Sequence, residues 1–226
     1  MIEQRSVEWY IVKQGKVSAS DCHKLMKGAG SRRLYMCDKA AERMSHRLTD
    51  NFPNRHIERG IALEPEAIRE YERRTGNFTI DGYWVEKQTW GCTPDAFVGD
   101  DGLLSIKCPM AKNVTRIMFS KSHKDDANFL EYYWQLQCEM AATGRLWGDL
   151  ALYCQEMILP EHQMYIRRIE RNEEDIAALV QAIDEFNAEL DAELRAIGVH
   201  WKFNTEENIR NAEPPQILDV ERYLHA

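Results

Sequence analysis

The stretch that decides the fold lies at residues 93–109 and reads TPDAFVGDDGLLSIKCP. Two strand-like segments, residues 89–98 and 103–108, flank the turn GDDG, a pattern typical of a β-hairpin. Side chains alternate across a strand, so Ser105 and Lys107 lie on one face, and hairpin pairing can bring Asp95 beside them. The stretch therefore predicts a carboxylate, a hydroxyl and an amine gathered at one point.

Outward from this hairpin, helical and strand patterns follow one another along the chain. The predicted helices cover residues 6–14, 19–27, 33–48, 58–75, 128–143 and 170–197, and the predicted strands cover 78–86, 89–98, 103–108, 146–155 and 163–169. This order predicts one α/β domain over residues 1–226, with a central mixed sheet flanked by helices. The last residues, from about 203 to 226, are expected to form an extended tail.

Composition narrows the class of protein. The chain has 226 residues, of which 44% are hydrophobic and 29% charged, which is an ordinary globular composition. No apolar run approaches the 18 residues of a membrane span, and the N-terminus lacks a signal pattern. The six cysteines are scattered without a CxxC pair, which favours reduced thiols in a cytoplasmic protein and disfavours a zinc site. The nucleotide-binding patterns GxGxxG and GxxxxGK[ST] are absent.

Charge is distributed unevenly along the sequence. The net charge is −8, yet residues 1–60 hold 12 Lys and Arg against 7 Asp and Glu, whereas residues 170–226 hold 5 against 14. A basic N-terminal part, residues 1–60, and an acidic C-terminal part, residues 170–226, are consistent with a protein that presents one face to an anion. An acidic helix that is merely solvated explains the same numbers.

The candidate chemistry centres on Asp95 and Lys107, with Glu64 on one predicted helix and Gln135 on another. Oxygen ligands hold Mg²⁺, which activates water for phosphodiester hydrolysis, and a lysine can stabilise the developing charge. From spacing alone, the more common reading of the pattern is structural, with Asp95 capping a turn and Lys107 reaching solvent.

Six short segments together resemble the lambda-exonuclease or YqaJ-type viral recombinase family of the PD-(D/E)xK nuclease superfamily. They are residues 7–9, 15–20, 59–64, 93–95, 106–109 and 135–137, in family order. The resemblance implies a metal-dependent 5′–3′ exonuclease that acts processively on linear double-stranded DNA and leaves 3′ overhangs for recombination. It also implies Mg²⁺, with Mn²⁺ as a substitute, a homotrimeric ring, a phage single-strand annealing protein as partner, and the cytoplasm of a bacterial host.

The resemblance also assigns roles at the active site. Asp95 matches the metal-bridging aspartate, Lys107 the catalytic lysine, Glu64 the glutamate near a second metal and Gln135 a glutamine beside the metals. The backbone carbonyl of Ile106 matches a metal ligand.

Position 105 departs from the family pattern, because the family has Glu there and this sequence has Ser105. Glu64, Glu139 or a water held by Ser105 are candidates to compensate. A DNA-binding or assembly subunit with impaired nuclease activity, or a structure-specific endonuclease, are the alternative functions.

A second set of residues matches the family's 5′-phosphate pocket. It comprises Lys13, Ser20, Thr93, Lys112 and Asn113, while Ile57 matches an apolar wedge that separates the last base pairs. A helix-capping role for Ser20, a solvated Lys13 and a packed Ile57 are the structural alternatives. Further candidate contacts to the DNA backbone are Arg32, Arg33, Arg43, Arg47 and Arg55.

Overall fold

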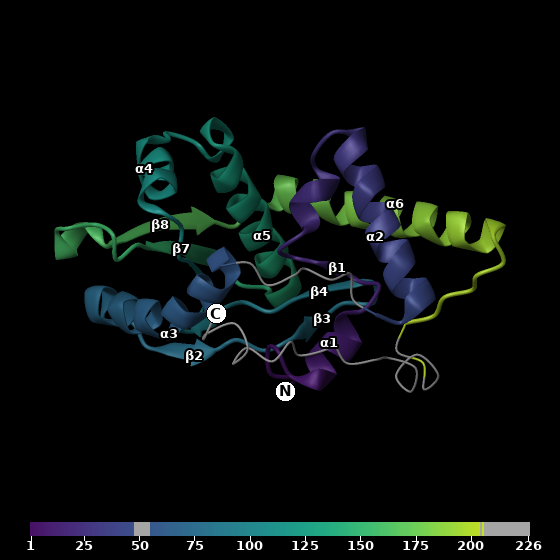
Figure 1. Ribbon diagram of the computed structural model, residues 1–226, viewed down its shortest axis with the longest axis horizontal. Helices are drawn as coiled ribbons and strands as arrows, with labels where there is room; N and C mark the ends of the chain where they lie inside the picture. The colour runs from purple at the N-terminus through teal and green to yellow at the C-terminus, as the bar shows by residue number, and fades with distance from the viewer. Residues whose placement is uncertain (48–54, 204, 206–226) are drawn as a thin grey trace.

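The computed structural model describes residues 1–47, 55–203 and 205, with the backbone alone for residues 55–57. Its strands form two sheets (Figure 1). The larger sheet has five strands in the order β2-β5-β6-β7-β8, and the smaller has three in the order β1-β4-β3. No helix within these ranges is both long and apolar enough to cross a membrane.

The larger sheet is mixed, as the sequence predicts. Its strands are β2 (Thr79–Asp81), β5 (Ala96–Val98), β6 (Gly102–Lys107), β7 (Trp147–Tyr153) and β8 (Met164–Glu170). β5 and β6 form the predicted antiparallel hairpin, β6 and β7 run parallel, and β8 returns antiparallel to β7. The parallel pair requires a crossover, which the helices between β6 and β7 supply.

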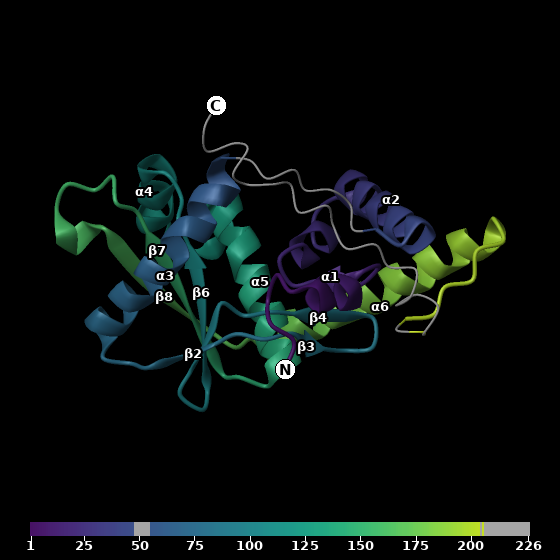
Figure 2. The ribbon, with the colours of Figure 1, turned by 60° about the horizontal axis from the view of Figure 1, so that its bottom comes forward.

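Helices cover both faces of this sheet, and β6 lies between α3 and α5 (Figure 2). α3 (Arg55–Thr75) packs Ala67 and Tyr71 against Leu104 and Ile106 of β6. On the other face, α4 (Ala111–Phe119) and α5 (Ala127–Thr143) pack against Leu103. Alternate residues of β6 therefore belong to two different cores, which makes the strand buried on both sides.

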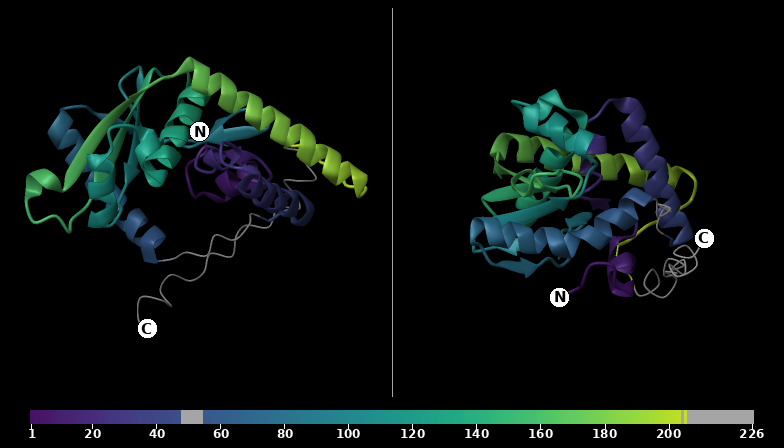
Figure 3. Two further views of the ribbon diagram at one scale, coloured as in Figure 1. Left: turned by 90° about the horizontal axis from the view of Figure 1, so that it is seen from above. Right: turned by 60° about the vertical axis from the view of Figure 1, so that its left-hand side comes forward.

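The smaller sheet and the remaining helices form the other end of the molecule. Its strands are β1 (Val17–Ser18), β3 (Val85–Glu86) and β4 (Trp90–Cys92), accompanied by α1 (Val7–Lys13), α2 (Ala29–Ser45) and α6 (Glu173–Ala196). α6 leaves the end of β8 and runs beside α2 (Figure 3), where Tyr35 stacks on Phe186 with ring centres 5.4 Å apart.

Two predicted strands were wrong as continuous elements. Residues 78–86 divide into β2 and β3, and residues 89–98 divide into β4 and β5, with each half in a different sheet. Pro94 lacks the N–H that a ladder requires. A Cβ on Gly82 would lie 1.6 Å from the Pro94 carbonyl oxygen, so the two backbone segments are in close contact here.

Two helix predictions also need correction, and one helix was missed. Residues 19–27 form only the 3₁₀ helix η1 (Cys22–Leu25), because Val17–Ser18 pairs with β4 and the Ala19 N–H donates to the Gly91 carbonyl. α2 begins at Ala29, four residues before the predicted start, and ends at Ser45. α4 was not predicted. By contrast, α5 and α6 lie close to their predicted bounds, and Gly144 ends α5 with a left-handed φ of 77°.

Candidate active site

A cavity of about 570 Å³ brings together residues that lie far apart in the sequence. Four of the predicted site residues line it: Glu64 from α3, Asp95 from the segment between β4 and β5, and Ile106 and Lys107 from the end of β6. Asn113, predicted for the 5′-phosphate pocket, lines the same cavity. The hairpin and α3 thus place two carboxylates and one amine around one space.

Asp95 is held in place by the hairpin itself. Its Oδ2 accepts a hydrogen bond of 2.6 Å from the backbone N–H of Ile106. Burial raises the pKa of the Asp95 carboxyl; Lys107 and the Ile106 N–H oppose this rise, while the negative charge of Glu64 adds to it. A buried carboxyl whose pKa is shifted by burial and by specific charged neighbours, in a cavity, marks a candidate functional site.

Glu64 is oriented by Arg5, whose Nη2 donates to Glu64 Oε2 at 2.8 Å. The Arg5 backbone has a left-handed φ of 67°, an uncommon conformation for a residue other than glycine. Arg5 also lines the cavity, so the chain supplies a positive charge there that the sequence analysis did not single out.

Lys107 faces α5, where its Nζ lies 5.5 Å from the centre of the Tyr132 ring. Gln135 lies one turn further along α5, and its Nε2 donates to Glu139 Oε1 at 2.8 Å. In this structure Gln135 therefore contacts the site through Glu139. Neither Gln135 nor Glu139 is among the residues that line the cavity.

Two buried polar atoms, Ser105 Oγ on β6 and Glu139 Oε2 on α5, have no hydrogen-bond partner. Each residue is only 1% exposed. Burial raises the pKa of Glu139 to about 8, and the negative charge of Asp95 adds to this rise. The hydrogen bond from Gln135 and the positive charge of Lys107 oppose it. Orphaned buried oxygens are rare in native proteins, and each calls for a ligand, a water or an ion.

The donor set fits a hard divalent cation. In the described ranges, no three His, Cys, Asp or Glu side chains lie close enough to hold a metal as a group. Mg²⁺ does not need such a group, because it binds through one or two carboxylates and takes its other ligands from water and substrate phosphate. Asp95 and Glu64, with the Ile106 carbonyl, would supply those carboxylate and carbonyl oxygens.

Lys13 and Thr93 are joined through Trp9. Trp9 Nε1 donates to Thr93 Oγ1 at 2.7 Å, and Lys13 Nζ lies 4.4 Å from the centre of a Trp9 ring. Burial lowers the pKa of the Lys13 ammonium to about 8, although Asp21 acts in the opposite direction. The fold thus brings a lysine and a hydroxyl separated by 80 positions to either side of one indole.

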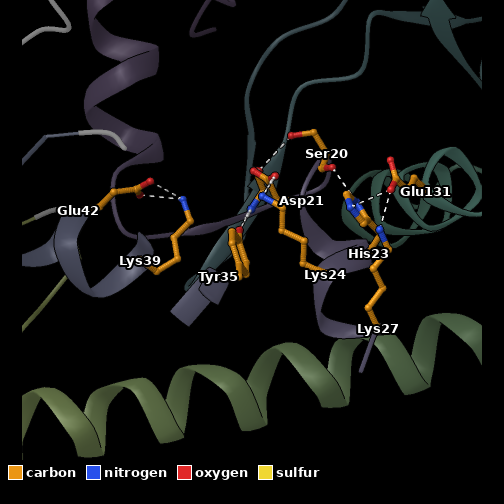
Figure 4. Close-up of polar contacts among 10 residues, drawn as sticks. Ser20, Asp21, His23, Lys24, Lys27, Tyr35, Lys39, Glu42 and Glu131 are labelled. Carbon is orange, nitrogen blue, oxygen red and sulfur yellow. Dashed lines mark hydrogen bonds and ion pairs between the residues drawn. The ribbon is translucent and has the colours of Figure 1, made fainter. Parts of the chain in front are cut away.

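Ser20 belongs to a network of charged side chains (Figure 4). Ser18 Oγ lies 3.2 Å from Ser20 Oγ and donates to Asp21 Oδ2 at 2.9 Å. Burial alone would raise the pKa of Asp21, but Lys24, Lys39 and Lys13 together lower it to about 2. Lys24 lies three residues after Asp21, a local spacing, and pairs with it at 2.7 Å. Lys39 carries no local signal, since only the tertiary fold brings it near Asp21.

Other predicted DNA contacts lie elsewhere. Lys112 is exposed in the first turn of α4, and the side chains of Ile57 and Arg55 lie outside the described residues. The prediction for Arg43 was wrong, because its side chain is fully buried and bonded to Gly15, Asn187 and Asp191.

Arg32 and Arg33 form ion pairs with Glu189 and Glu193 of α6. Part of the positive charge of residues 1–60 is therefore neutralised by acidic residues of α6.

The fold and the site together define the class of protein. A mixed sheet whose β5–β6 hairpin carries Asp95 and Lys107 beside a helix glutamate is the arrangement of a PD-(D/E)xK nuclease fold. The sequence model of the YqaJ-like viral recombinase domain matches residues 8–146, and the chain belongs to that family.

Solved structures agree with this assignment. An alkaline exonuclease from Laribacter hongkongensis (LHK-Exo) is 32% identical, with a TM-score of 0.77 over 85% of this chain and 96% of that one. The LHK-Exo complex with dAMP is 33% identical over the same shares, with a TM-score of 0.75. A phage-related exonuclease from Haemophilus somnus 129PT is 14% identical over 81% and 96%, with a TM-score of 0.69, and shares the fold. A search of curated proteins found no match.

Proposed function

We propose that this protein is a divalent-metal-dependent exonuclease that degrades the 5′-ended strand of linear double-stranded DNA. The convergence of Glu64, Asp95, Ile106 and Lys107 on one cavity carries this proposal. Similarity to the Laribacter alkaline exonuclease over most of both chains supports it. Mg²⁺ is the proposed cofactor, with Mn²⁺ as a substitute.

Different side chains of the site would bind the cation and orient the attacking water. A bound divalent cation would lower the pKa of a water and neutralise charge on the phosphate. Asp95 and Glu64 would hold that cation, with the Asp95 carboxylate oriented by the Ile106 N–H. Lys107, fixed above Tyr132, would orient the attacking water and stabilise negative charge as it develops.

A second group of polar residues, apart from Asp95 and Lys107, would recognise the end of the strand. Lys13, Thr93 and Ser20 would bind the 5′-phosphate, with Lys112, Asn113 and Ile57 as further DNA contacts. Lysine gives charge without the bidentate geometry of arginine, which suits a phosphate that must move after each cut. That LHK-Exo was solved with dAMP, a nucleoside 5′-monophosphate, supports release of mononucleotides by this chain.

The biological setting belongs to the same proposal. Processive digestion that leaves 3′ overhangs would supply a phage single-strand annealing protein with its substrate, in the cytoplasm of a bacterial host. A homotrimeric ring around the duplex would account for processivity, as family resemblance implies. Residues 1–226 would act as one domain.

Digestion of end-defined substrates tests the proposal. Linear duplex with a 5′-phosphate, linear duplex with a 5′-hydroxyl, and closed circular duplex are incubated with Mg²⁺ or with EDTA. We expect mononucleotide release from linear DNA, faster with the 5′-phosphate, and none from circles or with EDTA. Cutting of circles would favour a structure-specific endonuclease. DNA binding without any cleavage would favour a subunit whose nuclease activity is impaired by Ser105.

A further inference from the structure

One polar position on the α5 side of β6 is occupied by a short neutral side chain. Leu103, Ser105 and Lys107 share the face that packs on α5, because alternate side chains of a strand lie on one side. Leu103 contacts the α5 core and Lys107 lies over Tyr132 of α5. Between them, Ser105 is 1% exposed and its hydroxyl has no partner, so a short neutral side chain occupies a buried polar position.

One stripe of α5, the helix that packs on β6, is polar. Tyr132, Gln135 and Glu139 are spaced by three and four residues, which places them on one side of the helix. Gln135 holds Glu139 Oε1 at 2.8 Å and thereby orients the carboxylate, but Glu139 Oε2 has no partner. A carboxylate that is 99% buried with one free oxygen is costly to keep without a ligand.

Charge and side-chain size indicate which groups Glu139 Oε2 interacts with. Glu139 interacts electrostatically with Asp95 and Lys107, the two charged groups that flank Ser105 in the hairpin. A glutamate side chain extending from a helix can reach into space that a serine on the strand leaves open. Asp95 and Glu139 thus come from two different elements, and each acts electrostatically on a site that includes Lys107.

We propose that Glu139 supplies the carboxylate that position 105 lacks and that its Oε2 is a ligand of the divalent cation held by Asp95. This inference rests on the proposed function, because that function supplies the cation. Ser105 has no partner for its hydroxyl in this structure, and in the loaded site it would donate to the Glu139 carboxylate or to a water.

Mn²⁺ binding to the full chain, measured by isothermal titration calorimetry, tests the role of Glu139 without relying on activity. Four proteins are compared: wild type, Glu139→Gln, Ser105→Glu/Glu139→Gln, and the control Asp149→Asn. Asp149 is also a buried carboxylate, on neighbouring β7, but Tyr71 and Arg168 bond its oxygens. We expect Glu139→Gln to weaken Mn²⁺ binding by about tenfold or more, as loss of a metal-site group does. The double variant should recover most of this loss, and Asp149→Asn should bind Mn²⁺ like wild type.

Three outcomes separate the possibilities. Wild-type affinity in Glu139→Gln, or no recovery in a folded double variant, overturns the role of Glu139 while leaving the nuclease intact. Wild-type protein that neither binds Mn²⁺ nor degrades linear DNA overturns the proposed function instead. If Glu139→Gln does not fold, Glu139→Asp is measured, because it retains the charge but withdraws it by one methylene. Unchanged Mn²⁺ affinity in that variant also counts against the proposal.

Discussion

Replacing Arg43 by methionine should strongly destabilise this protein, although Arg43 lies outside the cavity. Its fully buried guanidinium donates to the Gly15 carbonyl at 3.0 Å, to Asn187 Oδ1 at 2.7 Å and to Asp191 Oδ1 at 2.7 Å. These bonds tie the end of α2 to α6 and to the turn before β1. Glu42 accepts the Gly15 N–H at 2.9 Å, so α2 holds both polar groups of this glycine.

The magnitude follows from the partners that would be left behind. Arg43→Met leaves the Gly15 carbonyl and the Asn187 side chain buried without this donor, at about 1–3 kcal/mol each. Asp191 is 35% exposed and can be rehydrated, so its loss adds little. Breaking one side of a buried charged network typically costs about 3–5 kcal/mol, and we expect a loss in this range. For a chain of this size it corresponds to a fall in Tm of roughly 6–20 °C.

Urea unfolding followed by circular dichroism measures this loss. The matched control is Arg33→Met on the same helix, because Arg33 also pairs with a glutamate of α6, but at 3.4 Å and with both side chains more than half exposed. The control should change stability by less than about 0.5 kcal/mol. A loss below about 1 kcal/mol for Arg43→Met would refute the view that this buried network fixes the Gly15 turn.

Three further predictions concern two site residues and one contact in the fold. Lys107→Met should reduce nuclease activity by roughly 10²–10³-fold in single-turnover digestion while leaving urea unfolding unchanged, because its amine acts on the reacting groups; retention of activity would exclude that role. Lys13→Met should abolish the preference for 5′-phosphorylated ends in competition digests, and the wild-type preference should decline as pH rises through about 8, where Lys13 loses its charge. Since unfolded Lys13 keeps a pKa near 10.5, wild-type stability should also rise with pH between those two values, and a flat profile would contradict the burial of Lys13. Gly82→Ala should destabilise the fold by about 1–3 kcal/mol in urea unfolding, because its Cβ would collide with the Pro94 carbonyl, and wild-type stability would disprove that contact.

Local patterns predicted those parts of the protein that depend on neighbours in the chain. The GDDG turn with its flanking apolar residues predicted the β5–β6 hairpin, and alternation along β6 predicted that Ser105 and Lys107 share a face. Helical spacing predicted α5 and α6 close to their bounds, with Gly144 at the end of α5. These features follow from turn chemistry and periodicity, which act over a few residues.

Only tertiary structure decided the features that join distant segments. The separation of residues 89–98 into two sheets depends on the crossing of Gly82 and Pro94. The burial of Arg43 depends on α6, which lies about 140 positions away. Likewise, nothing around Glu139 distinguishes it from an exposed helix glutamate until α5 packs on β6 and buries it. Side-chain environments of this kind arise from long-range packing, and a local pattern carries no record of which surface will cover it.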